Sequence, residues 1–99
     1  MPTPKAKYIA RLKKEILATH NCGSSHFTTV PVTEMSRGKI VWQGEVEVFD
    51  LLKHPQAGTC YAWSYDVNGR THITVLLGLP PVDSAESAVK VAIAAQAKG

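Results

Sequence analysis

The chain has 99 residues, of which 44% are hydrophobic and 19% charged, the composition of a globular domain rather than of a disordered or membrane-embedded chain. Its net charge of +3 is uneven: residues 1–15 carry five basic side chains against one acidic side chain, whereas residues 16–99 carry a net −1. No apolar run reaches the roughly 18 residues that cross a bilayer, and the basic, amphipathic N-terminus is not expected to be a secretory signal. The sequence therefore predicts a single cytoplasmic domain over residues 1–99, with Cys22 and Cys60 as free thiols.

The first predicted element is a helix from Ala6 to about Thr19. Its apolar residues recur at three- and four-residue steps and are Tyr8, Ile9, Leu12 and Ile16. Basic residues lie on the opposite side of this helix. Gly23 follows the helix and is expected to take the left-handed conformation that ends many helices.

Four β-strands and a second helix are predicted next. The strands are His26–Glu34, Ile40–Leu51, Thr59–Val67 and Arg70–Leu79. Pro31 indicates an edge strand, and bulges are expected at Gly44 and at residues 49–51. A helix over residues 84–97 follows, with Asp83 and Glu86 as its capping box. The order predicts an α+β fold: helix, four-stranded antiparallel sheet and helix, with both helices on one face of the sheet.

The Asn68-Gly69 pair predicts a two-residue hairpin, and this turn fixes which residues of the last two strands share a face. One face, here called the aromatic face, collects Tyr61, Trp63, Tyr65, His72, Thr74 and Leu76. The other, the small-residue face, collects Cys60, Ala62, Ser64, Ile73, Val75 and Leu77.

We expect the helices to cover the small-residue face, which allows close approach. From the second strand, Ile40, Trp42, Val46 and Val48 are expected to join the helices, and Gln43, Glu45 and Glu47 the aromatic face. The aromatic face then stays open in a monomer. Contiguous exposed apolar residues usually indicate a partner.

Several constellations carry possible chemistry. His20, Cys22 and His26 are zinc-ligand types, with His54, Cys60 or His72 as a fourth ligand, but their spacing is not a common zinc pattern. Cys60 in mid-strand under helices is a poor nucleophile. His72 beside Tyr65, with Glu45 or Glu47 as a carboxylate partner, is the best candidate for proton chemistry and makes a small enzyme the alternative function.

The basic N-terminal helix suggests a nucleic-acid surface as a further alternative. Acidic residues at the start of the second helix and among the aromatic residues argue against it, because they repel phosphates.

Four segments are distinctive: Val41–Leu51, His54-Pro55, Cys60–Trp63 and Pro80–Ser84 before an Ala/Val helix. Together they resemble a family of short uncharacterised bacterial proteins, some carried on mobile gene cassettes such as those of integrons, from about Phe27 to Ala95. The resemblance implies a bacterial, cytoplasmic accessory protein. It carries no known activity, cofactor or site residue.

The leading prediction is a small binding or interaction module without cofactor or metal. It self-associates as a homodimer, or holds an apolar ligand or a protein partner, on the aromatic face. The C-terminal helix is the competing surface for the dimer, because apolar residues cover more than half of its circumference.

Overall fold

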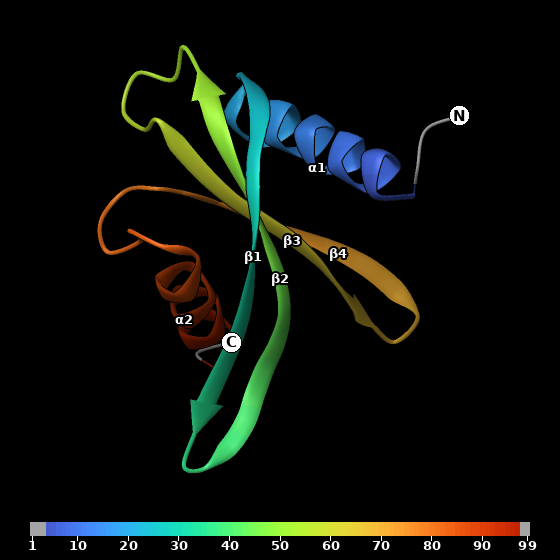
Figure 1. Ribbon diagram of the computed structural model, residues 1–99, viewed down its shortest axis with the longest axis vertical. Helices are drawn as coiled ribbons and strands as arrows, with labels where there is room; N and C mark the ends of the chain where they lie inside the picture. The colour runs from blue at the N-terminus through green and yellow to red at the C-terminus, as the bar shows by residue number, and fades with distance from the viewer. Residues whose placement is uncertain (1–3, 98–99) are drawn as a thin grey trace.

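The computed structural model describes residues 4–97. Its elements in chain order are α1 (Pro4–His20), β1 (Gly23–Ser36), β2 (Lys39–Leu52), β3 (Thr59–Val67), β4 (Arg70–Leu77) and α2 (Ala85–Ala97). The strands form one antiparallel sheet in the order β1-β2-β3-β4 (Figure 1). The predicted α+β class and element order are confirmed.

Left-handed residues mark the chain reversals. Asn21 ends α1 at φ 55°, and its N–H donates to the carbonyl of Leu17 at 2.9 Å, so Asn21 takes the role predicted for Gly23. Asn68 and Gly69 both have positive φ, as a type I′ hairpin turn requires. The predicted tight hairpin between β3 and β4 is therefore confirmed.

The β1–β2 ladder contains two bulges, neither of them where the sequence predicted. Phe27 is skipped between the pairs His26–Phe49 and Thr28–Val48, and Val41 is skipped near the hairpin turn. Both extra side chains are exposed, at 67% and 49%. Gly44 instead stays in the ladder, where the Trp42 ring would lie 3.1 Å from an added Cβ. Its missing side chain makes room for the indole.

The register of the sheet confirms one predicted face assignment and overturns another. Tyr65 pairs with His72 and Trp63 with Thr74, as predicted from the hairpin. In β2, however, Val48 pairs with Tyr61. Val46 and Val48 of β2 therefore lie with the aromatic face, together with Trp42, and Glu47 lies opposite. A one-residue shift reverses every side chain, and the connection over residues 53–58 gives no tight turn to fix the register.

The two helices contact different faces of the strands. Leu12 and Ile16 of α1 pack with residues of the small-residue face, among them Cys60 and Ala62. The helix α2 packs on the aromatic face instead. The predicted placement of both helices on one face is therefore wrong, because each face of this sheet is apolar and each recruits its own helix. Figure 1 shows α1 near the start of β1 and α2 near its end.

A reciprocal hydrogen-bond box caps α2 one residue later than predicted. The backbone N–H of Ser87 donates to Ser84 Oγ at 3.1 Å, and the backbone N–H of Ser84 donates to Ser87 Oγ at 2.9 Å. Ser87 Oγ also accepts from the backbone of Asp83 at 2.8 Å. Ser84 is thus the capping residue, and the predicted Asp83–Glu86 box is not formed.

Candidate functional site

The aromatic face, predicted to be open, lies largely under α2. Trp63 is 2% exposed and Tyr61 is 8% exposed. The covering residues of α2 are Ala85, Ala88 and Val89. Burial raises the pKa of the Tyr61 phenol, and the negative charges of Asp83 and Glu86 raise it further. These two rings are part of the hydrophobic core.

The outer part of the aromatic face is less covered. Tyr65 is half-buried and stacks on the exposed His72, with ring centroids 5.4 Å apart and an interplanar angle of 20°. Thr74 and Leu76 are half-buried between this stack and the core. Among the rings of β3 and β4 on this face, Tyr65 and His72 are therefore the ones that reach the surface.

The carboxylates expected beside His72 are on the other side of the sheet. Glu47 pairs with Ala62, a residue of the small-residue face, and Glu45 lies two positions away on the same strand. Side chains two residues apart on a strand share a face. The predicted partnership of His72 with Glu45 or Glu47 is therefore wrong.

Glu47 is the centre of a polar cluster that the sequence did not reveal. Its side chain is fully buried. Lys5 Nζ lies 2.6 Å from Oε2, and His26 Nε2 lies 2.9 Å from Oε1. The hydroxyl of Thr29 also donates to Oε1. We call these four residues the Glu47 cluster.

The Glu47 cluster joins the start of α1 to β1 and β2. Burial by itself raises the pKa of Glu47, but the hydrogen bonds from Lys5, Thr29 and His26 and the charge of Lys5 outweigh it, so the net pKa lies below its ordinary value. An ionised carboxylate with three donors holds the helix against the sheet. The arrangement is that of a structural anchor.

The histidine and cysteine residues considered as zinc ligands do not converge on one point but contact different neighbours. His20 pairs edge-to-face with His54 at 6.3 Å, whereas His26 contacts Glu47. Burial, and then the proximity of His54, lowers the pKa of His20. Burial, and then Cys22, raises the pKa of the Cys60 thiol to about 12. Within residues 4–97, no group of three or more His, Cys, Asp or Glu side chains is placed to hold a metal ion.

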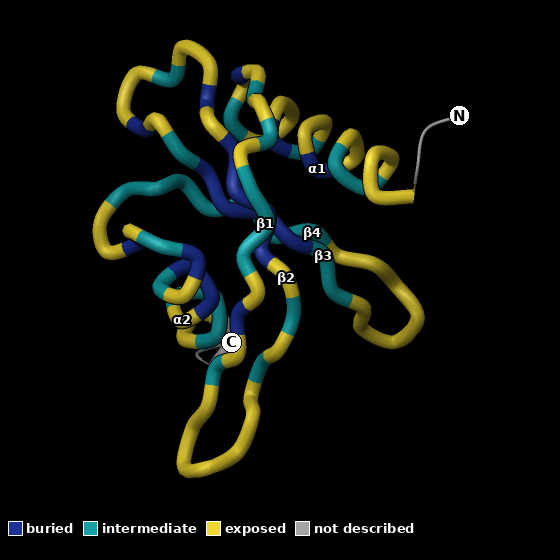
Figure 2. The backbone as a smooth tube through the Cα atoms, in the orientation of Figure 1, coloured by how far each residue is buried: buried dark blue, intermediate teal, exposed yellow. Residues whose placement is uncertain are grey.

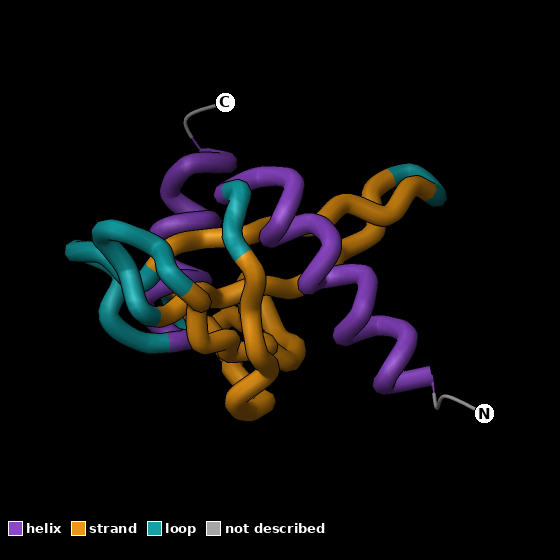
Figure 3. The backbone as a smooth tube through the Cα atoms, turned by 90° about the horizontal axis from the view of Figure 1, so that it is seen from above, coloured by secondary structure: helices purple, strands orange, loops and turns teal. Residues whose placement is uncertain are grey.

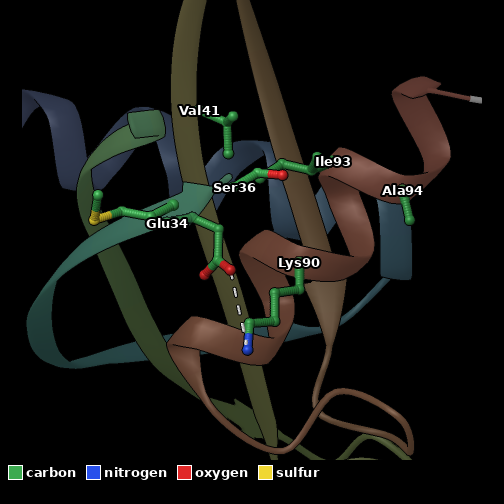
Figure 4. Close-up of a pocket in the computed structure, with 7 residues that line it drawn as sticks. Glu34, Ser36, Val41, Lys90, Ile93 and Ala94 are labelled. Atoms are coloured by element: carbon green, nitrogen blue, oxygen red, sulfur yellow. Dashed lines mark ion pairs between the residues drawn. The ribbon is translucent and has the colours of Figure 1, made fainter. Parts of the chain in front are cut away.

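A hollow of about 230 Å³ opens between α2 and the end of the β1–β2 hairpin (Figure 4). Its lining residues are Glu34, Met35, Ser36, Val41, Lys90, Ile93 and Ala94. Lys90 Nζ lies 4.0 Å from Glu34 Oε1, so one charge of each sign stands at the hollow. The rest of the lining is mainly apolar.

The hairpin end beside this hollow exposes large apolar side chains. Met35 and Ile40 are each 55% exposed, and the bulged Val41 is 49% exposed. Figure 2 shows both strands of the hairpin end as exposed, and Figure 1 shows that they extend past α2. Ile40 was predicted to lie under the helices, and its exposure shows that this prediction is wrong. The length of the two strands was the signal that part of the hairpin has no helix to cover it.

We use the name tip surface for the exposed apolar residues of the hairpin end together with the α2 residues that line the hollow beside it: Met35, Ile40, Val41, Ile93 and Ala94. It combines residues of β1, β2 and α2. Two of its exposed apolar side chains, Met35 and Val41, also line the hollow.

Comparisons with protein-family models, curated proteins and solved structures give no match. The resemblance to short bacterial proteins therefore stays a prediction. Neither of the described helices is long and apolar enough to cross a membrane.

Proposed function

We propose that the protein is a small interaction module that forms a homodimer through the tip surface. The observation that carries this proposal is the exposure of Met35, Ile40 and Val41 within seven residues of one hairpin end. Side chains of this kind are costly to leave in water when they adjoin one another. Burial in an interface removes that cost.

A protein partner suits this surface better than an apolar small molecule. The hollow measures about 230 Å³, below the roughly 300–1,000 Å³ of typical small-molecule sites. Much of the apolar exposure, including Ile40, lies outside the hollow on the hairpin. An exposed hairpin end beside a small hollow offers area rather than enclosure, which favours a macromolecular contact.

A second copy of the chain is the partner that the charges favour. In a twofold interface each patch meets its own copy. Glu34 lies on β1 and Lys90 on α2, at the two walls of the hollow. Two copies facing each other can therefore pair Glu34 of one with Lys90 of the other, without leaving like charges opposed.

The packing of α2 supports the tip surface over the aromatic face as the dimer surface. Trp63, the centre of the predicted interface, is already covered by α2 within one chain. The other predicted dimer surface, on the C-terminal helix α2, remains available for a partner. The exposed end of the β1–β2 hairpin adds apolar area next to it. A cytoplasmic location and a bacterial origin belong to the same proposal and rest on the sequence alone.

The proposal is tested by placing a charge on the tip surface. Val41→Glu puts a carboxylate at a bulge that makes no ladder pair, so the fold should tolerate it. Val67→Glu is the matched control, because Val67 is 46% exposed on β3 next to the distant β3–β4 turn. The molecular mass of all three proteins is measured in solution by sedimentation, with circular dichroism to verify folding.

We expect a two-chain mass for the wild type and Val67→Glu and a one-chain mass for Val41→Glu. A carboxylate buried in an apolar interface without a partner is strongly unfavourable. A wild type that stays monomeric at high concentration would contradict the dimer. If the wild type and a folded Val41→Glu variant both have a two-chain mass, the dimer does not form through the tip surface.

A further inference from the structure

A second groove, of about 370 Å³, runs between α1 and β4. Its lining residues are Arg11, Lys14, Glu15, Ala18 and Ile73. The four helical positions follow steps of three, four and seven residues, which place them on one side of α1. Ile73 comes from β4, the last strand of the sheet. Figure 3 shows α1 next to the strands near the middle of the molecule, from which the N-terminal end of the helix and the β3–β4 hairpin diverge.

The groove combines a net positive charge with two apolar residues. Within residues 4–97, Arg11, Lys14 and Glu15 take part in no ion pair. Two cations and one carboxylate leave a net charge of +1 at the walls. Ala18 and the half-buried Ile73 add hydrocarbon surface. A matching ligand therefore has one negative charge and an apolar body.

We propose that this groove binds a monocarboxylate with a short apolar chain. The planar guanidinium of Arg11 suits a carboxylate, which it can contact through two parallel hydrogen bonds. The ammonium of Lys14, one turn along the same helix, adds a second donor. The chain of the ligand lies along Ala18 and Ile73, where it loses contact with water.

The charge of Glu15 selects among anions. A phosphate carries close to two negative charges near neutral pH, and it would meet Glu15 with a larger repulsion than a carboxylate meets. Long nucleic acids need several phosphate contacts in a row, whereas this groove supplies two cations beside an acid. The volume falls within the roughly 300–1,000 Å³ of small-molecule sites.

This site is independent of the proposed dimer. The groove lies between α1 and β4, whereas the hollow of the tip surface lies between α2 and the end of the β1–β2 hairpin. Loss of one function leaves the other intact, so the two proposals fail separately.

The test uses octanoate as the probe and octanol as its uncharged counterpart. Each is titrated into isotopically labelled full-length protein, and amide shifts are followed by NMR. The test variant is Arg11→Gln with Lys14→Gln. Its matched control, Lys7→Gln with Lys13→Gln, removes the same charge from exposed positions of α1 outside the groove.

We expect octanoate to shift the amides of Lys14, Ala18 and Ile73 in the wild type and in the control variant. The test variant should bind at least about tenfold more weakly, because the loss of one charge-assisted contact alone already corresponds to about that factor. Octanol should bind more weakly than octanoate. Equal binding of octanol, equal loss in both variants, or no octanoate shifts at these residues would overturn the proposal. So would salt-sensitive binding of DNA or RNA, lost in the test variant, in place of octanoate binding.

Discussion

Glu47→Gln is the substitution that most sharply tests how α1 is fastened to the sheet. Hydrogen bonds to a charged group contribute about 1.5–3 kcal/mol, and neutral ones about 0.5–1.5 kcal/mol. The amide therefore loses about 1 kcal/mol at each of the partly buried donors His26 and Thr29. The Lys5 side chain is 46% exposed, so its ion pair adds at most about 1 kcal/mol. We expect a total loss of about 2–3 kcal/mol in the free energy of unfolding.

The loss is measured by urea denaturation at neutral pH. Glu45→Gln is the matched control, because Glu45 is an exposed carboxylate on the same strand and face. The control should stay within about 0.5 kcal/mol of the wild type. An unchanged or raised urea midpoint for Glu47→Gln would refute the anchoring role, because the carboxylate would then be worth no more than an amide.

The same pair of proteins gives a pH dependence with a definite sign. Folding lowers the pKa of Glu47 from its ordinary value of 4.5. The ionised carboxylate therefore stabilises the folded state fully above pH 4.5, and this contribution is lost as the pH falls through the folded pKa. The stability difference between wild type and Glu47→Gln should shrink below pH 4.5. A difference that grows on acidification would show that the pKa is raised instead.

Two further predictions concern α2 and the core. Ser84→Ala should lower the free energy of unfolding by about 1 kcal/mol, because it removes the capping hydroxyl. Asp83→Ala should lower the free energy of unfolding by less than Ser84→Ala does. A larger loss for Asp83→Ala would show that Asp83 is the capping residue, as the sequence predicted. The buried thiol of Cys60, with a pKa of about 12, should resist iodoacetamide at pH 8 until urea unfolds the protein. The rate of Cys60 alkylation is measured by peptide mass spectrometry. Equal rates in the native and the unfolded protein would show that the thiol is accessible in the fold.

Local signals in the sequence predicted the elements and one strand pair correctly. The Asn68-Gly69 turn fixed the β3–β4 register because a two-residue loop leaves one alignment. The apolar spacing of Leu12 and Ile16 likewise predicted the buried side of α1.

The candidate site was not predictable in the same way, because it depends on contacts distant in sequence. The faces of β2 depended on the connection over residues 53–58, and the wrong choice placed Glu47 beside His72. Lys5 and Glu47 are 42 positions apart, so no local pattern joins them. The Trp63 ring, polar at one edge, suited a core as well as an interface. Trp63 is buried because α2 packs against it, and the sequence does not show on which face α2 packs.

The most direct test of the dimer through the tip surface is an isotope-filtered NOE measurement. Labelled and unlabelled wild-type chains are mixed in equal amounts, so that only contacts between different copies give signals. We predict intermolecular NOEs that connect the methyl groups of Met35 and Val41 with those of Ile93. Intermolecular NOEs at Leu17 or Val67 instead, or none at a concentration where the wild type is fully associated, would contradict an interface at the tip surface.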